Sequence, residues 1–275
     1  MIDAHQHFWS LATPGHEWPT LTEAAIHRDF GPADLIPQAH DLDLKATVLV
    51  QSQPSDTDTD WILALARRTP LVAAVVGWAD LAAPSAPKRI AALAQAPKMR
   101  GLRPMLQSIE DTDWLLRSEV APAIAAMQLH GLRFDALVQP RHLPMLARFA
   151  DRWPHLPIVI DHGAKPLVAR EMLDPWRAEI AALAARGAWC KLSGLRTEQA
   201  DMQPVSALTP YIDHLVETFG QRLMWGSDWP VLQLSGDSYR EWATTAARLA
   251  GLDGAARERL FAGAAAEFYG LSQAE

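Results

Sequence analysis

The sequence predicts one (β/α)8 barrel spanning residues 1–275. Eight short apolar segments are separated, for the most part, by segments with the pattern of helices. This alternation implies right-handed βαβ units and a parallel sheet, and eight units in about 250 residues are typical of a closed barrel. An open doubly wound sheet is the alternative, but residues 1–10 contain no glycine for its glycine-rich first turn.

The elements follow from the order of apolar, helical and turn-forming residues. The predicted strands are residues 1–7, 46–51, 71–78, 100–104, 133–138, 157–162, 188–193 and 222–228. The predicted helices are residues 60–68, 87–95, 114–129, 143–153, 239–250 and 255–269, with two more beginning at Asp174-Pro175 and Thr209-Pro210 and ending at Gly187 and Gly220. Prolines and glycines after the first strand predict a long loop there.

Composition narrows the class of protein. The apolar content of 49% and charged content of 21% are those of a soluble globular chain, and the net charge of −7 disfavours a nucleic-acid partner. One cysteine, Cys190, excludes an intrachain disulfide. We see no signal-peptide pattern and no apolar run long enough for a membrane helix, so we expect a cytoplasmic protein without a membrane partner. An oligomer is compatible with the sequence.

The opening strand carries two histidines, His5 and His7. Side chains alternate along a strand, so both imidazoles are expected on the same side. Two imidazoles on one face are half of a metal site, whereas a single hydrogen-bonded histidine at a strand end would be structural. Further ligands at the other strand ends would decide between these readings.

Other strands end in side chains that can bind or react. Barrel enzymes carry their catalytic groups at the C-terminal ends of the strands, so these side chains are expected around one cavity. Beyond the first strand they are Gln51, Trp78, Asp80, Arg103, Gln139, Arg141, Asp161, His162, Lys191, Ser193, Ser227 and Asp228.

Three imidazoles and one carboxylate stand out in this set: His5, His7, His162 and Asp228. They could hold one divalent ion, zinc being the first choice, with a position open for water. Alternatively they bind substrate and water directly, without a metal. In either case Asp228 is the candidate base for water, and its structural alternative is a turn or helix-cap residue.

Two cations at strand ends have competing interpretations. Arg103 could polarise a carbonyl or bind a carboxylate or hydroxyl, or it could form a salt bridge at the barrel mouth. Lys191 shares a strand face with Ser193 and could bind substrate, or its stem could be buried with its ammonium in water.

The motifs at these strand ends resemble the amidohydrolase superfamily. They are IDAHQHFW, GLRPM, DHGAKP, KLSGL and WGSDWPV, beginning at residues 2, 101, 161, 191 and 225. The resemblance covers nearly the whole chain and is narrower to the amidohydrolase-2 branch, which contains hydrolases of sugar lactones such as L-fuconolactone and L-rhamnonolactone. His-x-His alone is weak, but its combination with Asp-His-Gly and Gly-Ser-Asp-Trp-Pro is specific.

The resemblance implies roles for individual residues. His5 and His7 match the strand-one pair, His162 the strand-six histidine, and Asp228 the strand-eight aspartate that activates water. The superfamily often has a bridging lysine or glutamate where this chain has Arg103, and a histidine where this chain has Val138-Gln139. A two-metal site is therefore not expected; the branch implies one metal or, as in its metal-free lactonases, none.

The expected reaction is hydrolysis of a sugar lactone, with Asp228, His162 and Arg103 as catalytic residues. Asp228 would take the proton from water, while a metal, or the imidazoles with Arg103, would polarise the carbonyl. By position, Trp78 and Trp229 would form walls for the sugar ring. The expected hydroxyl partners are Arg28, Gln51 and Lys191.

Two other functions remain open. The same branch resembles metal-dependent acid decarboxylases with a similar set of histidines and aspartate, which the ligand set does not distinguish from lactonases. A sugar-acid or metal-binding protein without turnover is disfavoured, because a base and an electrophile are both present.

Overall fold

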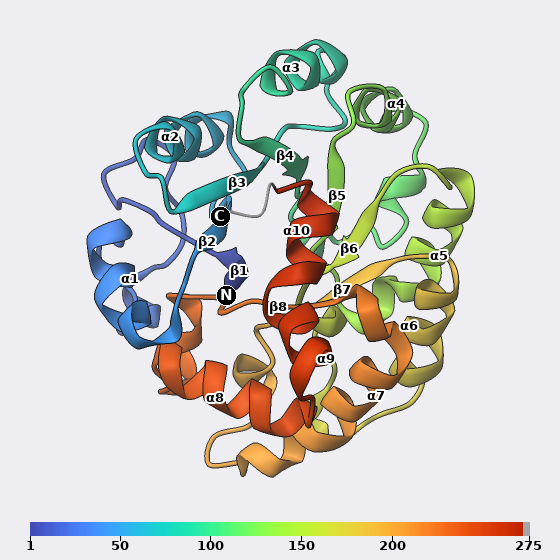
Figure 1. Cartoon of the computed structure of the whole chain (residues 1–275). Helices are drawn as coiled ribbons and strands as arrows, with labels where there is room; N and C mark the ends of the chain where they lie inside the picture. Colours follow the sequence, from blue (N-terminus) through green and yellow to red (C-terminus); the bar gives the residue numbers. More distant parts are fainter. Residues whose placement is uncertain (272–275) are drawn as a thin grey trace.

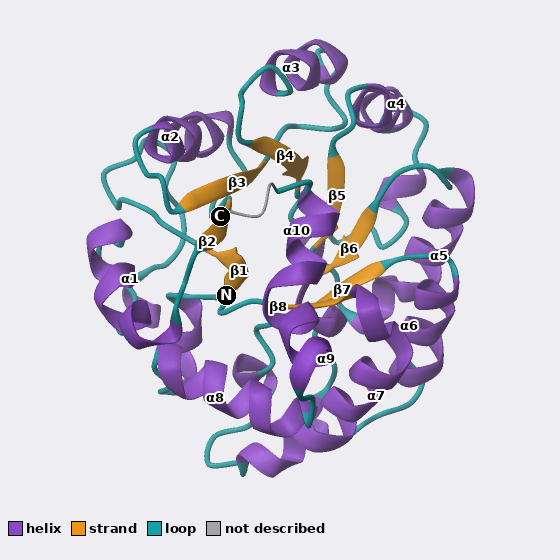
Figure 2. Ribbon diagram, viewed as in Figure 1, coloured by secondary structure: helices purple, strands orange, loops and turns teal. Residues whose placement is uncertain are grey.

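The computed structural model describes residues 1–271, so the last four residues of the predicted 1–275 domain lie outside the described part. Eight parallel strands form one sheet in the order β1 to β8, and a ring of helices surrounds them (Figures 1 and 2). The strands are β1 (Ile2–Gln6), β2 (Ala46–Val50), β3 (Val72–Gly77), β4 (Met99–Leu102), β5 (Arg133–Ala136), β6 (Ile158–Ile160), β7 (Trp189–Leu192) and β8 (Leu223–Trp225). The predicted (β/α)8 barrel is confirmed.

The barrel closes between its first and last strands just beyond the end of β8. The His7 amide donates to the Trp229 carbonyl at 2.7 Å, and the Asp228 amide donates to the His5 carbonyl at 2.8 Å. The closing ladder therefore runs through the histidine pair and Asp228, which brings the first strand and the segment after β8 into one site.

The helices shield the outer faces of the strands. They are α1 (Pro32–Ala39), α2 (Asp56–Arg67), α3 (Ala86–Leu93), α4 (Ala121–Leu129), α5 (Leu143–Arg152), α6 (Trp176–Ala185), α7 (Thr209–Phe219), α8 (Tyr239–Ala250), α9 (Gly254–Glu258) and α10 (Ala264–Tyr269). Both faces of the sheet are covered, so β2 and β3 are mostly buried and apolar, with Thr47 as their one polar residue. No helix within residues 1–271 has the length and apolar character that crossing a bilayer requires.

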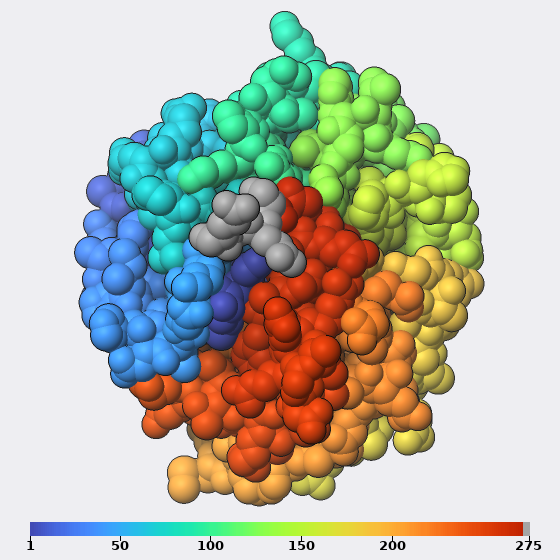
Figure 3. Space-filling view, viewed as in Figure 1, coloured from blue at the N-terminus to red at the C-terminus, as the bar shows by residue number. Residues whose placement is uncertain are grey.

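The C-terminal helix α10 closes the N-terminal end of the barrel. Its buried residues, among them Phe268 and Tyr269, pack with interior residues of the strands such as Val48, Val76 and Met224. Figure 3 shows the C-terminal segment over the middle of this face. The opposite, C-terminal end of the strands is left for the site.

The structure corrects four of the predicted elements. The predicted first loop contains α1, where Pro32 is at the helix start and the Asp34 carboxylate accepts from the Gly31 amide at 2.9 Å. Helix α2 begins before residue 60, because Ser55 caps the Asp58 amide. Residues 114–129 form a short 3-10 turn and then α4, and residues 255–269 form α9, a π-helical turn and α10.

Candidate active site

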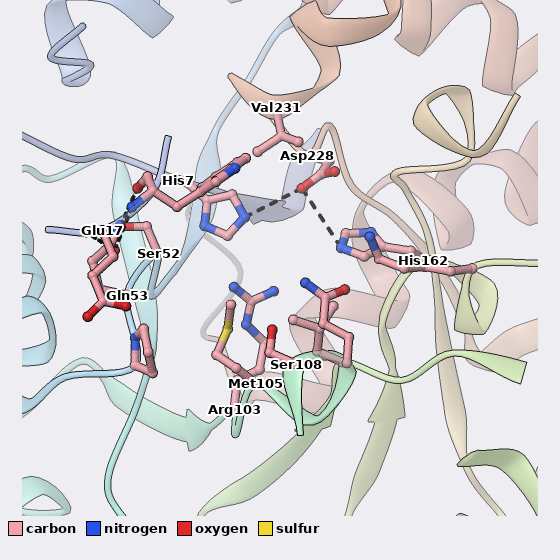
Figure 4. Close-up of a pocket in the computed structure, with 15 residues that line it drawn as sticks. His7, Glu17, Ser52, Gln53, Arg103, Met105, Ser108, His162, Asp228 and Val231 are labelled. Carbon is pink, nitrogen blue, oxygen red and sulfur yellow. Dashed lines mark hydrogen bonds and ion pairs between the residues drawn. The ribbon is translucent and has the colours of Figure 1, made fainter. Parts of the chain in front are cut away.

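A cavity of about 340 Å³ opens at the C-terminal ends of the strands. A volume of this order suits a small molecule. Figure 4 shows its side chains, which come from loops after most of the strands. The lining residues are His7, Glu17, Trp18, Ser52, Gln53, Pro54, Arg103, Met105, Gln107, Ser108, Leu137, His162, Lys165, Asp228 and Val231.

The two histidines of the opening strand meet in the centre of the site, as their spacing predicts. The Nε2 atoms of His5 and His7 lie 3.2 Å apart, and both side chains are almost fully buried. His7 donates from Nδ1 to the Val50 carbonyl at 2.9 Å, since a carbonyl can only accept. The lone pair of His7 Nε2 therefore faces the site.

Asp228 projects over this pair from the turn after β8. Its Oδ1 atom lies 3.4 Å from Nε2 of His7, 3.6 Å from Nε2 of His5 and 3.9 Å from Nε2 of His162. Burial alone would raise the pKa of the Asp228 carboxyl, but His162, His7 and His5 hold it below its usual value. Asp228 is thus a carboxylate at neutral pH, as a base for water must be.

The backbone around Asp228 is left-handed, with φ of 56° at this residue. Such a conformation costs about 1–2 kcal/mol for a residue with a side chain, and the closing ladder holds it in place. Gly226 precedes the turn because a Cβ there would lie 2.8 Å from Cβ of His5. The strand end can therefore approach the first histidine closely only with glycine at this position.

His162 reaches the site from a left-handed turn after β6. Residues 162–165 all have positive φ, between 51° and 63°. The imidazole Nδ1 lies 2.9 Å from the Ser193 hydroxyl, which orients Nε2 toward Asp228. Burial lowers the pKa of His162 to about 4, so the ring is neutral at physiological pH.

Arg103 points into the cavity from the side opposite Asp228 (Figure 4). Its guanidinium donates to the Gln51 carbonyl at 2.6 Å and lies 3.4 Å from Asp161. One nitrogen, Nη1, is 3.5 Å from Nε2 of His5, so a fixed positive charge stands beside the imidazoles. Arg103 forms the predicted salt bridge, here with the buried Asp161, and it also lines the cavity, where a substrate carbonyl or carboxylate could reach it.

Lys191 is not where either prediction expected it. Its side chain is fully buried beneath the cavity, and Nζ lies 2.5 Å from Asp135, 2.9 Å from Asp161 and 3.2 Å from Nδ1 of His5. Although burial opposes its charge, the two carboxylates raise the pKa of Lys191. The substrate-binding assignment is corrected: Lys191 contacts His5 from behind and does not line the cavity.

The other four predicted substrate contacts also lie outside the cavity lining. Arg28 pairs with Asp34 at 2.8 Å, and Gln51 is buried with its amide donating to the Arg103 carbonyl at 3.0 Å. Trp78 lines a neighbouring groove, and Trp229 is buried against aromatic side chains. A position at a strand end or in a loop does not settle which way a side chain points, and none of these four side chains lines the cavity.

Sequence reasoning missed residues at the mouth of the cavity. The buried amide of Gln53 accepts from the backbone amides of Glu17 and Trp18 at 3.0 and 3.3 Å and so fixes this part of the first loop. Lys165 also lines the cavity and lies 3.4 Å from Glu198. Lys165 belongs to the DHGAKP motif, so its place in the sequence could have indicated a site residue. No sequence pattern indicated that Gln53 contacts the first loop.

The donor set at the centre fits one divalent metal ion. His5, His7 and Asp228 offer two imidazole nitrogens and one carboxylate oxygen, separated by 3.2, 3.4 and 3.6 Å. Ligands at about 2.0–2.1 Å around a tetrahedral ion are separated by about 3.3 Å, so the spacing suits such an ion. A second group of possible ligands, His5, Asp161 and His162, shares His5 with the first group.

Comparisons with known proteins cover nearly the whole chain. The chain is 48% identical over 280 residues to an L-fucono-1,5-lactonase of Burkholderia ambifaria, covering 99% of this chain and 96% of that protein. A second L-fucono-1,5-lactonase, from Burkholderia multivorans, is 36% identical over 99% of this chain and 96% of its own.

A solved structure shares the fold in detail. An amidohydrolase from Burkholderia multivorans, crystallised with bound zinc, superimposes with a TM-score of 0.92 at 36% identity, covering 98% of this chain and 99% of its own. Residues 2–271 of the chain, from the histidine-bearing first strand to the end of α10, match the sequence profile described as amidohydrolase. With barrel, strand-end donors and profile in agreement, the protein belongs to the amidohydrolase family.

Proposed function

We propose that the protein hydrolyses a sugar-derived lactone, such as L-fuconolactone or L-rhamnonolactone, to the sugar acid. The observation that carries the proposal is the position of the ionised Asp228 carboxylate, which faces three imidazoles while Arg103 stands across the same cavity. The two lactonases at 48% and 36% identity support this substrate class.

Asp228 acts as general base in the first step. It takes a proton from a water molecule as the water oxygen attacks the lactone carbonyl, a contribution typically of about 10²–10⁴-fold. Because the carboxylate is ionised and buried, it needs no prior deprotonation and its hydrogen bond to water is not lost to bulk solvent.

Arg103 stabilises the negative charge that develops on the carbonyl oxygen. Its charge is permanent and its guanidinium is already oriented by Gln51 and Asp161, so little reorganisation is needed as the oxyanion forms. His162, neutral and oriented by Ser193, offers its Nε2 to the reacting atoms. When the tetrahedral intermediate collapses, the proton held by Asp228 passes to the ring oxygen that leaves.

We assign His5, His7 and Asp228, with His162 at the open side, as the residues that would hold a divalent metal, zinc first. Such an ion would act as a Lewis acid toward the carbonyl or the water. The donor spacing and the zinc-bound relative at 36% identity support this assignment. A lactonase panel run with and without a chelator tests whether the ion is required.

The substitution Asp228→Asn tests the central role. It keeps the shape of the side chain but removes the base, so we expect lactone hydrolysis to fall by about 10²–10⁴-fold. The matched control is Asp213→Asn at an exposed position of α7, which should retain wild-type activity. Acid release from aldonolactones, followed with a pH indicator, gives the rates.

The same assay separates the rival functions. Hydrolysis of a lactone releases an acid without carbon dioxide, whereas a decarboxylase would release carbon dioxide from an aromatic or other acid. Near-wild-type hydrolysis by the Asp228→Asn protein would remove Asp228 as base. No turnover of any aldonolactone would favour decarboxylation or binding without turnover.

A further inference from the structure

Lys191 meets the active site from below, at Nδ1 of His5, the ring nitrogen on the side away from His7 and Asp228. The ammonium forms ion pairs with Asp135 at 2.5 Å and Asp161 at 2.9 Å, and it lies 3.2 Å from Nδ1 of His5. All four side chains are fully buried, so no water competes for these contacts. Tyr269 of α10 donates to the Asp135 carboxylate at 2.6 Å and holds the lower end of the group.

The direction of the contact between Lys191 and His5 follows from the chemistry of the two groups. An ammonium has three protons and no acceptor, and a neutral imidazole has one donor nitrogen and one acceptor nitrogen. Nδ1 of His5 must therefore accept from Lys191, which leaves the imidazole proton on Nε2. Asp161 is the competing partner of Nδ1, but its Oδ1 lies at 3.4 Å, beyond the usual range for an N–H···O bond.

His7 agrees with this proton arrangement. Because His7 donates from Nδ1 to the Val50 carbonyl, its Nε2 is an acceptor. The Nε2 proton of His5 points at this acceptor over 3.2 Å. One directed chain of hydrogen bonds thus runs from Lys191 through His5 and His7 to Val50. Nη1 of Arg103 lies 3.5 Å from Nε2 of His5, beyond the usual range for a hydrogen bond, and the guanidinium donates instead to the Gln51 carbonyl at 2.6 Å.

The same arrangement opposes a cation at the centre. A metal ion needs the lone pairs of both Nε2 atoms, and the Nε2 of His5 holds a proton in this chain. To bind an ion, His5 must move its proton to Nδ1, donate it to Asp161 and lose its contact with Lys191. Partners on the far nitrogen of a ligating histidine commonly change metal affinity by about 10–100-fold.

We propose that Lys191 is a positioning residue that fixes neutral His5 with its proton on Nε2 and thereby weakens the binding of a divalent cation by His5, His7 and Asp228. This inference rests on the proposed function in one respect: it takes His5, His7 and Asp228 as the residues that would hold the metal. Lys191 and Asp161 then compete for Nδ1 of His5. The partner that prevails sets the affinity of the site for a divalent cation.

The tautomer can be observed directly in the wild-type protein. Metal-free protein labelled with ¹⁵N-histidine is examined by long-range ¹H–¹⁵N correlation NMR, with the His5 signals identified by their loss in His5→Gln. We expect the pattern of an imidazole protonated on Nε2. A pattern of protonation on Nδ1 would overturn the proposal, and this result does not depend on any Lys191 variant folding.

Cation affinity supplies the second readout. Zinc binding is measured by competition with a chromophoric chelator for wild type, Lys191→Met and the control Lys165→Met, which removes a positive charge from the cavity wall without touching His5. We expect Lys191→Met to bind zinc about 10–100-fold more tightly, with the His5 proton moved to Nδ1, and Lys165→Met to stay close to wild type.

Two outcomes would contradict the proposal. Equal zinc affinity in wild type and a folded Lys191→Met protein would show that Lys191 does not govern the site, and an equal gain in Lys165→Met would show a general effect of charge. Neither measurement uses a lactone, so a failure of the proposed hydrolase activity would be seen separately from a failure of this inference.

Discussion

His7 and Asp228 lie far apart in the sequence, yet Nε2 of His7 and Oδ1 of Asp228 are 3.4 Å apart. The backbone that joins β1 to the segment after β8 makes this contact, through the bond from the His7 amide to the Trp229 carbonyl. The same hydrogen bonds therefore close the barrel and bring the site residues together. A substitution that loosens this ladder should lower activity before it unfolds the rest of the barrel.

Gly194 offers a test of how closely the site is packed. A Cβ at this position would lie 2.4 Å from Nδ1 of His162, and φ is +60°. Gly194→Ala should displace the imidazole and reduce lactone hydrolysis by about 10²-fold, the effect of a misplacement of about 1 Å. Steady-state kinetics with a sugar lactone would measure the loss.

The matched control for Gly194 is Gly187, which follows α6 and also has positive φ but has no atom within 4 Å of an added Cβ. Both alanine variants should lose roughly 1–2 kcal/mol of stability from the left-handed backbone. Only Gly194→Ala should lose activity. Equal activity in the two variants would mean that the position of His162 is unimportant.

Arg103 should contribute through its charge. We expect Arg103→Met to lower kcat by about 10²–10³-fold, the cost of removing one donor to an oxyanion, and Arg103→Lys to recover part of it. Arg100→Met is the control, because Arg100 lies in β4, just before Arg103, and its guanidinium donates to the carbonyls of Pro97 and Met99. A rise in KM with kcat unchanged would instead show that Arg103 binds the substrate in its ground state.

Burial of neutral His162 predicts a pH dependence of stability. The pKa of this imidazole is about 4 in the folded protein and about 6.5 in an unfolded chain, so the unfolded state binds the extra proton between these values. Stability should therefore be complete above about pH 6.5 and fall by up to about 3 kcal/mol on acidification to pH 4.

Chemical denaturation of wild type, His162→Gln and His155→Gln across this range would measure the effect. The His162→Gln protein should show a shallower decline, whereas replacement of the exposed His155 should leave the slope unchanged. Parallel slopes in all three proteins would place the titrating group elsewhere.

The Asp228 carboxyl predicts a loss of stability in the same direction, on acidification, but at a lower pH than for His162. Its pKa is held below the usual value in the folded state, so its ionised form stabilises the fold above the ordinary carboxyl pKa of about 3.9, and this stability is lost as the pH falls through the lower, folded value. The basic form should also persist through the mildly acidic range. A titration of kcat/KM with the lactone should therefore show no loss of the base near pH 4 to 5, within the range where the fold remains intact.

Much of the fold follows from local patterns. Apolar segments of strand length, proline starts and glycine ends located all eight strands and most helices, because backbone propensity and burial on both sheet faces act within short windows. The patterns missed α1, whose start is marked by the capping carboxylate of Asp34 and not by a clear apolar period. They also merged a 3-10 turn and α4 into one predicted helix, although Pro122 marks the start of α4.

The sequence by itself determined the barrel, the histidine pair on one strand face and the strand ends at which His162, Arg103 and Asp228 stand. Only the tertiary structure decided what those groups touch: that His5 is held between Lys191 and His7, that Lys191 lies beneath the site, and that Trp78 and Trp229 do not line the cavity. The physical reason is that strand periodicity acts between neighbours in the chain, whereas the direction of a side chain beyond a strand end depends on loops and buried charges that come from distant segments.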